Sequence, residues 1–473
     1  MKILYVTSEA NPYLASGGLG DVMGALPKAI AENPDVNAEV IMPLYNTIKP
    51  EYRQKMEWVI DISFDLSWRH TGATIYKIVN DKVTYYFVEN HQYFDRGRLY
   101  GEYDDAERFA FFSRAVVEYM LASGNIPDIL HANDWQCAPA IIYLKTEYAN
   151  IWAFNKIKTV YTIHNIEYQG KFDPYILGGV FGIDTRFKGL VEFDGCLNLM
   201  KGAIVTSDFV TTVSPNYACE LEHDFFAFGL SPVIKAARNK MRGVINGIDY
   251  TYFSPETGGD IYEAYNATNY KAKKAKNKTA FQAEVGLEVN KDIPLIVMIT
   301  RFASQKGIDL VLHIIEELLH ENVQVAILGT GEPEYEKAFA DIGSRYPNLK
   351  ALIKFDRVLS KKMYAAADIF LMPSKSEPCG LAQMIACSYG TIPIVRSVGG
   401  LYDSIRSYGE DGANGFRFDN YNAHELLFTT KSALELYKNK RKWNALTASA
   451  KNSQFSWENS AKEYLAIYNN LLI

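Results

Sequence analysis

Residues 367–381 read Ala-Asp-Ile-Phe-Leu-Met-Pro-Ser-Lys-Ser-Glu-Pro-Cys-Gly-Leu, an apolar run followed by a polar turn that carries one acid. The apolar half predicts a buried strand of a parallel sheet, and Pro378 and Gly380 predict a tight turn before a helix that begins near Leu381. Open α/β sheets bind ligands at the carboxyl ends of their strands, and a helix N-terminus there can hold an anion through its free N–H groups. The stretch therefore places Glu377 beside a predicted anion site, which suits an enzyme whose leaving group is a phosphate.

Short apolar runs alternate with amphipathic helical stretches in both halves of the chain, which predicts two Rossmann-like α/β domains. Strands are expected at residues 3–6, 38–42, 85–88, 129–131, 159–163 and 209–213, and again at 294–299, 324–328, 369–372 and 392–395. The run Val-Ile-Asn-Gly-Ile-Asp at 244–249 is the predicted domain boundary. A polar, lysine-rich segment at 250–278 follows it, either as a surface excursion or as the entry into the second domain.

The composition sets limits on the class of protein. A chain of 473 residues exceeds one ordinary hydrophobic core, and 48% apolar with 22% charged residues is the balance of a globular protein. The net charge of −6 argues against a surface built for nucleic acid or anionic lipid.

Cysteine usage and the N-terminus indicate the compartment. The five cysteines form no Cys-x-x-Cys pair and no disulfide framework, which fits a reducing cytoplasm. The first residues enter a predicted strand at once, so no signal peptide is expected, and no apolar run is long enough to span a bilayer. We therefore expect a cytoplasmic protein with neither a nucleic-acid nor a membrane partner.

A glycine-rich loop, Ala-Ser-Gly-Gly-Leu-Gly-Asp at residues 15–21, follows the first predicted strand. Glycines between a strand and a helix let the backbone approach a phosphate or sugar closely, although such loops also serve as plain tight turns. Asp21 is expected to cap the helix N-terminus, whether or not it also contacts a ligand. The loop alone leaves ligand binding and simple turn formation open.

Two cations, Arg301 and Lys306, follow the first strand of the second domain. An arginine fork and a lysine point charge together suit a diphosphate. An isolated pair at this spacing is more often a solvated loop pair, but Glu377 falls at the same predicted sheet edge, which favours a ligand site. Gly399 and Gly400 follow another strand and offer a further nest of backbone N–H groups for an anion.

Polar clusters also close two strands of the first domain, at residues 131–135 and 162–165. A lone histidine at a strand end is more often structural than catalytic, but two such clusters at one edge favour a cleft. His164 and Asp134 could hydrogen-bond sugar hydroxyls or stabilise developing positive charge. No cluster has metal-ligand spacing, and no Ser/His/Asp or Cys/His nucleophile pattern is present, so neither a metal nor a cofactor is expected.

These motifs resemble those of bacterial glycogen synthases and plant starch synthases, which are retaining glycosyltransferases of the GT-B fold. The resemblance runs essentially end to end, and it includes the run Thr-Ile-His-Asn-Ile-Glu-Tyr-Gln-Gly at 162–170. The other matching segments are 8–9, 17–19, 131 with 134–135, 212–215, 246–249, 301 with 305–307, 377–381, 389–391, 399–401 and 455–457. Any one motif could arise by chance, whereas the ordered set is specific.

The resemblance implies two Rossmann-like domains whose parallel sheets face each other across a cleft. Residues 1–245 would form the acceptor-side domain, joined by the C-terminal helix at 455–473, and residues 246–454 would form the nucleotide-sugar domain. The implied reaction transfers glucose from ADP-glucose to the non-reducing end of an α-1,4-glucan with retention, without a metal.

The resemblance also implies roles for individual residues. Arg301 and Lys306 would bind the diphosphate, Glu377 would face the donor sugar, and His164 and Asp134 would hold the glucose and the reaction centre. The implied donor-binding residues are Gly17, Gly18, Asp21, Tyr100, Asn246, Phe355, Cys379, Gly380, Leu381, Gly399 and Gly400.

The chain departs from the family at residues 15–16, where Ala-Ser replaces a pair that usually contains lysine. Val398 likewise replaces a hydroxyl residue, and Asn133 replaces a histidine. Because the missing lysine normally helps to hold the nucleotide sugar, UDP-glucose remains an alternative donor. A non-catalytic glucan-binding homologue is a further hypothesis, against which the retained catalytic set argues.

Overall fold

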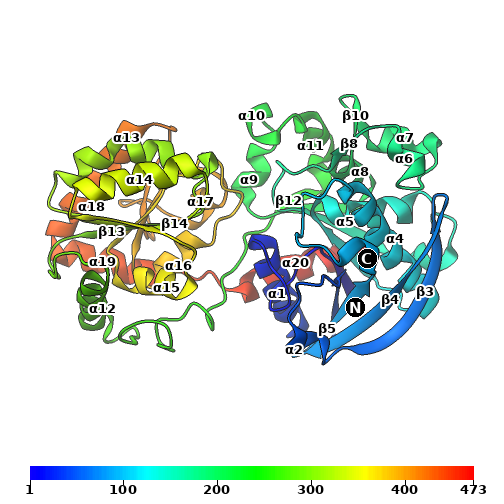
Figure 1. Ribbon diagram of the computed structural model, residues 1–473, viewed down its shortest axis with the longest axis horizontal. Helices are drawn as coiled ribbons and strands as arrows, with labels where there is room; N and C mark the ends of the chain where they lie inside the picture. Colours follow the sequence, from blue (N-terminus) through cyan, green and yellow to red (C-terminus); the bar gives the residue numbers. More distant parts are fainter. The chain divides into compact units, whose positions relative to one another are not determined.

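The computed structural model describes residues 1–473, and contacts within the chain divide it into two units (Figure 1). The first unit comprises Met1–Gly247 together with Trp457–Ile473, and the second comprises Ile248–Ser456. Each unit contains a parallel sheet core with helices packed around it, which confirms the predicted α/β class with two Rossmann-like domains.

The large sheet of the first unit has nine strands in the order β12-β11-β7-β6-β1-β2-β5-β4-β3. Seven of them run parallel: β1 (Lys2–Val6), β2 (Asn37–Pro43), β5 (Val83–Glu89), β6 (Ile129–Asn133), β7 (Lys158–Ile163), β11 (Phe209–Thr212) and β12 (Met241–Gly243). The antiparallel strands β4 (Arg69–Asn80) and β3 (Glu57–Leu66) extend the sheet beyond β5. A small sheet joins β8 (Lys171–Phe172), β10 (Cys196–Asn198) and β9 (Glu192–Phe193).

Helices of the first unit vary from single turns to five turns. They are α1 (Gly18–Ala31), α2 (Pro50–Arg53), α3 (His91–Phe94), α4 (Asp105–Ser123), α5 (Asp134–Lys145), α6 (Ile176–Gly179), α7 (Lys188–Val191), α8 (Leu199–Thr206), α9 (Pro215–Glu220), α10 (Asp224–Ala227), α11 (Ser231–Ala237) and α20 (Trp457–Leu472). Gly17 is the N-cap residue of α1, so the expectation that Asp21 caps this helix is wrong. Asp21 lies in the first turn, where its carboxylate accepts a hydrogen bond from Asn11 at 2.5 Å.

The second unit has one six-stranded sheet, and all of its strands are parallel. Its order is β15 (Leu349–Ile353), β14 (Gln324–Gly329), β13 (Leu295–Ile299), β16 (Ile369–Met372), β17 (Ile392–Arg396) and β18 (Phe416–Phe418). The helices are α12 (Tyr270–Val285), α13 (Ile308–Leu319), α14 (Pro333–Arg345), α15 (Arg357–Ala366), α16 (Ala382–Ser388), α17 (Gly399–Ser404), α18 (Ala423–Lys438) and α19 (Lys440–Lys451). The polar segment at 250–278 begins without regular structure and ends inside α12.

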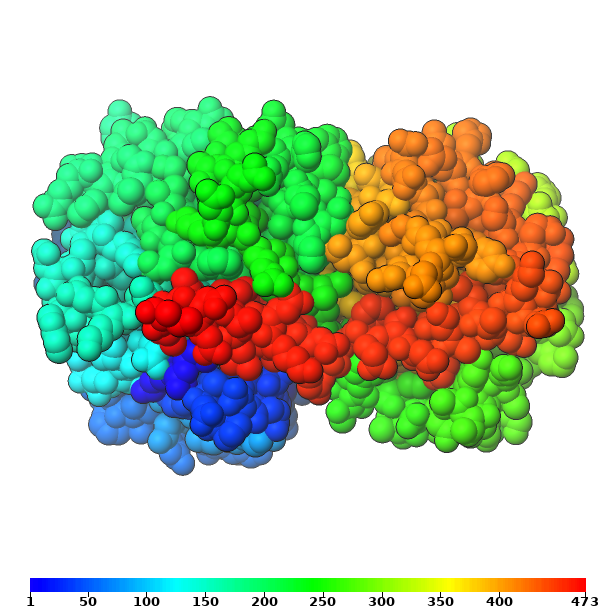
Figure 2. Space-filling model, turned by 180° about the vertical axis from the view of Figure 1, so that it is seen from behind, coloured from blue at the N-terminus to red at the C-terminus, as the bar shows by residue number.

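The last helix returns to the first unit. Helix α20 packs against α1, and Figure 2 shows the C-terminal residues, in red, lying against the N-terminal part of the chain, in blue. The Tyr468 hydroxyl reaches His131 on β6 at 2.7 Å, and the Ser460 hydroxyl donates to the Ile245 carbonyl at 2.7 Å. None of the helices combines the length and the apolar character that a membrane span requires.

The chain leaves the first unit and comes back at neighbouring points. The Ile248 amide donates to the Phe455 carbonyl at 2.8 Å, and Ile248 forms a parallel β-bridge with Ser456. The outgoing and returning segments therefore pair with each other where the two units join.

Candidate active site

Glu377 stands in the loop between β16 and α16 of the second unit. The apolar strand ends at Met372, and the turn closes through Gly380, whose φ of +72° lies in the region that favours glycine. The Glu377 carboxylate is 8% exposed; its Oε2 accepts a hydrogen bond from the Ser374 hydroxyl at 3.0 Å and lies 2.7 Å from Lys306 Nζ. A largely buried carboxylate is thus held by one hydroxyl and one cation, as buried acids require.

The loop after β13 carries the two predicted cations. Lys306 lies 20% exposed at its side chain, whereas Arg301 is exposed. Gly307 follows at φ +72°, and a Cβ there would lie 2.1 Å from the Pro373 carbonyl oxygen. Only glycine therefore lets the loop that carries Lys306 approach the loop that carries Glu377 so closely.

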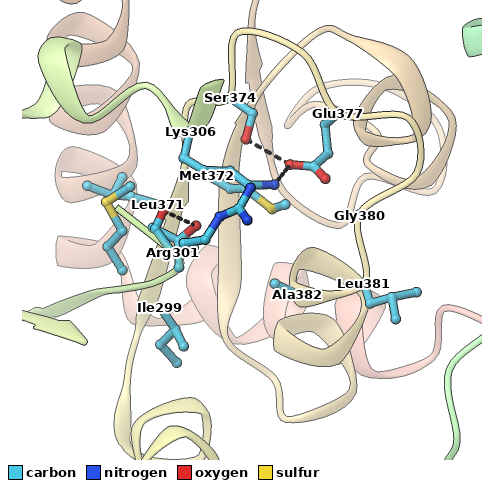
Figure 3. Close-up of a pocket in the computed structure, with 12 residues that line it drawn as sticks. Ile299, Arg301, Lys306, Leu371, Met372, Ser374, Glu377, Gly380, Leu381 and Ala382 are labelled. Atoms are coloured by element: carbon cyan, nitrogen blue, oxygen red, sulfur yellow. Dashed lines mark hydrogen bonds and ion pairs between the residues drawn. The ribbon is translucent and has the colours of Figure 1, made fainter. Parts of the chain in front are cut away.

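These residues line one cavity of about 240 Å³ at the carboxyl edge of the sheet (Figure 3). Its walls include Arg301, Lys306, Glu377, Gly380 and Leu381, and Figure 3 shows Lys306 extending towards Glu377. Two cations beside one carboxylate give the site a net positive charge, which suits an anion that carries more than one negative charge.

Gly399 and Gly400 pack against the same loop from the next strand. The Gly400 amide donates to the carbonyls of Glu377 at 3.2 Å and Pro378 at 3.1 Å, and Gly399 has a φ of +45°. A Cβ on Gly399 would lie 2.0 Å from the Glu377 carbonyl oxygen. The Gly400 N–H is therefore used to hold the Glu377 loop, where the sequence predicted a nest for an anion.

Two other predicted donor-binding residues of this unit lie outside the cavity lining. Cys379 is buried within the turn at 5% exposure, and Phe355 is 79% exposed after β15, with the Arg357 guanidinium 5.8 Å from its ring. An exposed ring can stack on a base, whereas Cys379 serves the packing of the turn.

Asp134 and His164 come together at the carboxyl ends of β6 and β7 in the first unit. Asp134 has a φ of +55°, a strained conformation for a residue with a side chain, and its Oδ1 accepts the His164 amide at 2.8 Å. Burial raises the pKa of the Asp134 carboxyl to about 7 and lowers the pKa of the His164 imidazole to about 3. His164 is therefore neutral at physiological pH.

The tautomer of His164 follows from its partner. Nε2 lies 2.9 Å from Oδ1 of Asn133, a carbonyl oxygen that can only accept, so Nε2 carries the proton. Nδ1 is then the acceptor nitrogen. Asn133, which departs from the family pattern, thus positions the imidazole.

The glycine-rich loop of the first unit is organised by Glu9, a residue without a predicted role. The Glu9 carboxylate accepts hydrogen bonds from Ser16 N at 2.6 Å, Ser16 Oγ at 2.7 Å and Gly20 N at 3.2 Å. A Cβ on Gly17 or Gly18 would meet no atom within 4 Å, so their backbone borders open space. The signal was the position of Glu9, three residues after the first strand and eight residues before Gly17.

Tyr100 and Asn246 complete the predicted residues of the first unit. The Tyr100 hydroxyl is 2.8 Å from Ser8 Oγ beside this loop. Asn246 is 6% exposed, and its Oδ1 has no hydrogen-bond partner within the protein. An unpartnered buried oxygen is costly, which points to a donor supplied by a ligand.

His131, in contrast, belongs to the core. Its Nδ1 is 2.7 Å from the Tyr468 hydroxyl and its Nε2 is 2.5 Å from Thr162 Oγ1, and burial lowers its pKa to about 3. This histidine joins strands and helix α20, as the structural alternative predicted.

Sequence comparisons agree over both units. The profile described as starch synthase catalytic domain matches residues 2–236, and the profile described as glycosyl transferases group 1 matches residues 282–449. A glycogen synthase of Clostridium beijerinckii is 46% identical over 478 residues, which cover 100% of this chain and 99% of that protein. A glycogen synthase of Alkaliphilus metalliredigens is 43% identical over 476 residues, which cover 100% of both chains.

The chain belongs to the glycogen synthase family. The resemblance predicted from its motifs is confirmed, and the protein is a glycosyltransferase.

Solved structures extend the family likeness to the fold. The catalytic domain of starch synthase IV from Arabidopsis thaliana, bound to ADP and acarbose, matches with a TM-score of 0.89 and 31% identity over 99% of both chains. A sucrose-phosphate synthase from Thermosynechococcus elongatus matches with a TM-score of 0.62 and 16% identity over 99% of this chain and 98% of that one, which reflects the shared fold. The predicted GT-B fold is confirmed.

Proposed function

We propose that this glycosyltransferase transfers glucose from ADP-glucose to the non-reducing end of an α-1,4-glucan, with retention of configuration. The observation that carries the proposal is the cavity in which Arg301, Lys306 and Glu377 meet. The names of the relatives support a glucan product, and the ADP held by the starch synthase of Arabidopsis supports an adenine nucleotide.

The two cations suit the chemistry of the leaving group. The bond from the anomeric carbon to the phosphate oxygen breaks, and negative charge grows on the diphosphate. Arg301 and Lys306 lie where fixed positive charge would stabilise that growing charge more than the ground state. Lys306 has three protons, so it can bind a phosphate oxygen while it stays paired with Glu377.

The proposed transfer proceeds by attack on the same face from which the diphosphate leaves. The acceptor O4 bonds to the anomeric carbon, and its proton passes to an oxygen of the departing phosphate. A double displacement needs a carboxylate nucleophile and normally a second carboxyl group as acid and base, and Glu377 is the only carboxylate among the residues that line the cavity. Its negative charge is suited to stabilise the oxocarbenium-like sugar.

The first unit would contribute hydrogen-bonding groups. His164 and Asp134 would hydrogen-bond the glucose, and Asn246 would supply its unpartnered Oδ1 to a hydroxyl. The remaining proposed donor contacts come from Gly17, Gly18, Asp21, Tyr100, Phe355, Gly380 and Leu381, and from the backbone around Cys379, Gly399 and Gly400. We also propose that the enzyme acts in the cytoplasm, where sugar nucleotides are made.

UDP-glucose is the alternative donor, because the loop at residues 15–16 departs from the family pattern. Ser16 in the Ala-Ser pair binds Glu9 through both its amide and its hydroxyl, so this loop supplies no cation to a phosphate. A non-catalytic glucan binder is disfavoured because such a protein would not need the paired cations of the cavity.

The test measures release of nucleoside diphosphate from ADP-glucose and from UDP-glucose, each with and without glycogen. ADP release that depends on glycogen is expected. If only UDP-glucose gives glycogen-dependent release, UDP-glucose is the donor. If neither donor gives release, both enzymatic hypotheses are rejected. The configuration of the product is read from its digestion by an α-specific glucosidase.

A further inference from the structure

Loops that follow adjacent strands of the second sheet meet at Lys375, two positions before Glu377. Strands β13, β16 and β17 are neighbours in this sheet. The Lys375 amide donates to the Gln305 carbonyl in the loop after β13, at 2.8 Å. The Lys375 carbonyl accepts from Arg396 Nη1, at the end of β17, at 3.2 Å. The backbone that leads to Glu377 is thus held by both neighbouring strands.

Tyr421, which follows the next strand β18, connects Arg396 to the loop of Lys306. The Arg396 guanidinium carbon lies over its ring at 5.6 Å from the centroid, and Lys375 Nζ lies over the ring at 5.8 Å. The Tyr421 hydroxyl donates to Asp309 Oδ1 at 2.5 Å, in the first turn of α13. Asp309 comes three residues after Lys306, so both members of the Lys306–Glu377 pair are braced by the same group of side chains.

We propose that Arg396 is a positioning residue for glucosyl transfer: it fixes the Lys375 peptide and thereby sets the place of the Glu377 carboxylate. This inference rests on the proposed function. Arg396 is 8% exposed and does not line the cavity, so its effect on the reaction passes through Lys375.

The chemistry of the side chain explains why arginine stands here. A guanidinium donates a charge-assisted hydrogen bond to the carbonyl and presents a flat face to the Tyr421 ring, whereas an ammonium is a point charge without a flat face. A shift of about 1 Å in a catalytic group costs on the order of 100-fold in rate. Loss of the brace should therefore be visible in turnover.

Arg396→Met is the main test, because methionine keeps the apolar stem and removes the hydrogen bond. We expect kcat to fall by roughly 10- to 100-fold and the KM for ADP-glucose to change by less than about twofold, since Arg301 and Lys306 remain. Arg396→Lys should recover part of kcat, because its ammonium can still donate to the Lys375 carbonyl. A side chain with a purely structural role would lower the melting temperature without this split between kcat and KM.

Arg417 on β18 provides a matched control. Its Nη1 donates to the Tyr402 carbonyl at 3.2 Å, and its guanidinium carbon lies 4.6 Å from the Tyr402 ring. It therefore combines a carbonyl bond and an aromatic contact as Arg396 does, without contacting the Glu377 loop. Arg417→Met should leave kcat within about twofold of the parent.

The outcomes separate this inference from the proposed function. Parental kcat in both Arg396 variants, or an equal loss in Arg417→Met, would overturn the inference. If Arg396→Met does not fold, the kcat of Arg396→Lys is compared with the kcat of Arg417→Lys. Parental kcat in Arg396→Lys, or an equal loss in Arg417→Lys, would then overturn the inference. Absence of nucleotide release in the parent would overturn the proposed function and this inference together, whereas an active parent with parental kcat in Arg396→Met overturns the inference alone.

Discussion

The side chain of Glu377 has a fixed direction because Ser374 and Lys306 both bind its Oε2. Oε1 is therefore the oxygen that the local contacts leave to face a sugar. A carboxylate held in this way needs no reorganisation when positive charge develops beside it, which is the condition for strong electrostatic stabilisation.

Replacement of Glu377 by alanine should lower turnover by about 100-fold or more, because the charge opposite the oxocarbenium-like sugar is lost. The measurement is glycogen-dependent nucleotide release under saturating donor. Ser374→Ala is the control: it removes one hydrogen bond while the Lys306 pair remains, and a loss of less than 10-fold is expected. Near-normal turnover of Glu377→Ala would show that the reaction centre lies elsewhere.

At the scale of elements, three loops of the second sheet are interlocked by glycines. Gly307 lets the β13 loop pass the β16 loop, and Gly399 lets the start of α17 pass the Glu377 carbonyl. Each has a positive φ and a space too small for a methyl group. The carboxyl edge of this sheet therefore depends on two positions where no side chain fits.

Gly399→Ala is predicted to disturb the site through packing. The methyl group would meet the Glu377 carbonyl oxygen at 2.0 Å, and alanine in this strained conformation costs about 1–3 kcal/mol. We expect a lower melting temperature together with a loss of turnover on the order of 100-fold. Gly189→Ala, where a Cβ would meet nothing within 4 Å, is the control for the substitution itself. Unchanged activity in Gly399→Ala would mean that the loop tolerates displacement.

A buried hydrogen-bonded chain joins helix α20 to the first sheet. It runs from Tyr5 through Tyr468, His131 and Thr162 to Thr211. The three contacts from Tyr468 to Thr211 have distances of 2.5 to 2.7 Å. Thr162 lies two residues before His164 on β7. The C-terminal helix is thus linked through His131 to β7, the strand that ends one residue before His164.

The neutral state of His131 predicts a pH dependence of stability. The unfolded histidine binds a proton near pH 6.5, whereas burial lowers the folded pKa to about 3. Between these values the unfolded state binds more protons, so the free energy of unfolding contributed by His131 falls as pH falls, by about 1.4 kcal/mol per pH unit. His164 acts in the same direction, and Asp134, with its raised pKa, opposes both.

Denaturant titrations at pH 7, 6 and 5 compare the parent with His131→Gln. The difference in unfolding free energy between the two proteins should shrink as pH is lowered below 6.5, because only the parent has a histidine at position 131 that takes up a proton on unfolding. Tyr468→Phe, which keeps His131, is the control and should retain the parental slope. A constant difference between parent and His131→Gln would contradict a neutral folded histidine.

The extent to which sequence predicted this site depends on the kind of signal. Strands such as β1, β13 and β16 are buried on both faces and stand out as apolar runs, so their carboxyl ends could be located with their polar residues. Strands β3 and β4 are partly exposed and were not predicted, although the alternation that ends at Leu66 marks β3. Glu9 and Arg396 could not be assigned, since their importance lies in backbone groups that no motif displays.

At the scale of the whole molecule, the first unit is completed only by the last residues of the chain. Trp457, Ala461, Tyr464, Ile467 and Tyr468 of α20 are buried, at 7% exposure or less. Removing them would expose α1 and leave the Tyr5 and His131 groups without their partner. Burial of one such side chain is worth about 1.5–3 kcal/mol, so their combined loss reaches the stability of an ordinary domain.

A chain that ends at Ser456 is therefore expected to lose the cooperative unfolding of the first unit while the second unit stays folded. Calorimetry and limited proteolysis measure this, with a protected fragment expected only from residues 248–456. A chain that lacks only Ile473, which is fully exposed, is the control and should behave as the parent. An intact first unit in the shorter chain would show that α20 is dispensable.

The β-bridge between Ile248 and Ser456 has a genetic consequence. The second unit starts and finishes at residues that pair with each other. It is therefore one continuous segment of the chain, inserted into the first unit at a single place. Recombination between homologues at these two codons would exchange the complete second unit and would leave no part of it behind. The joint is thus a place at which the whole second unit, with the cavity lined by Arg301, Lys306 and Glu377, could be exchanged among relatives.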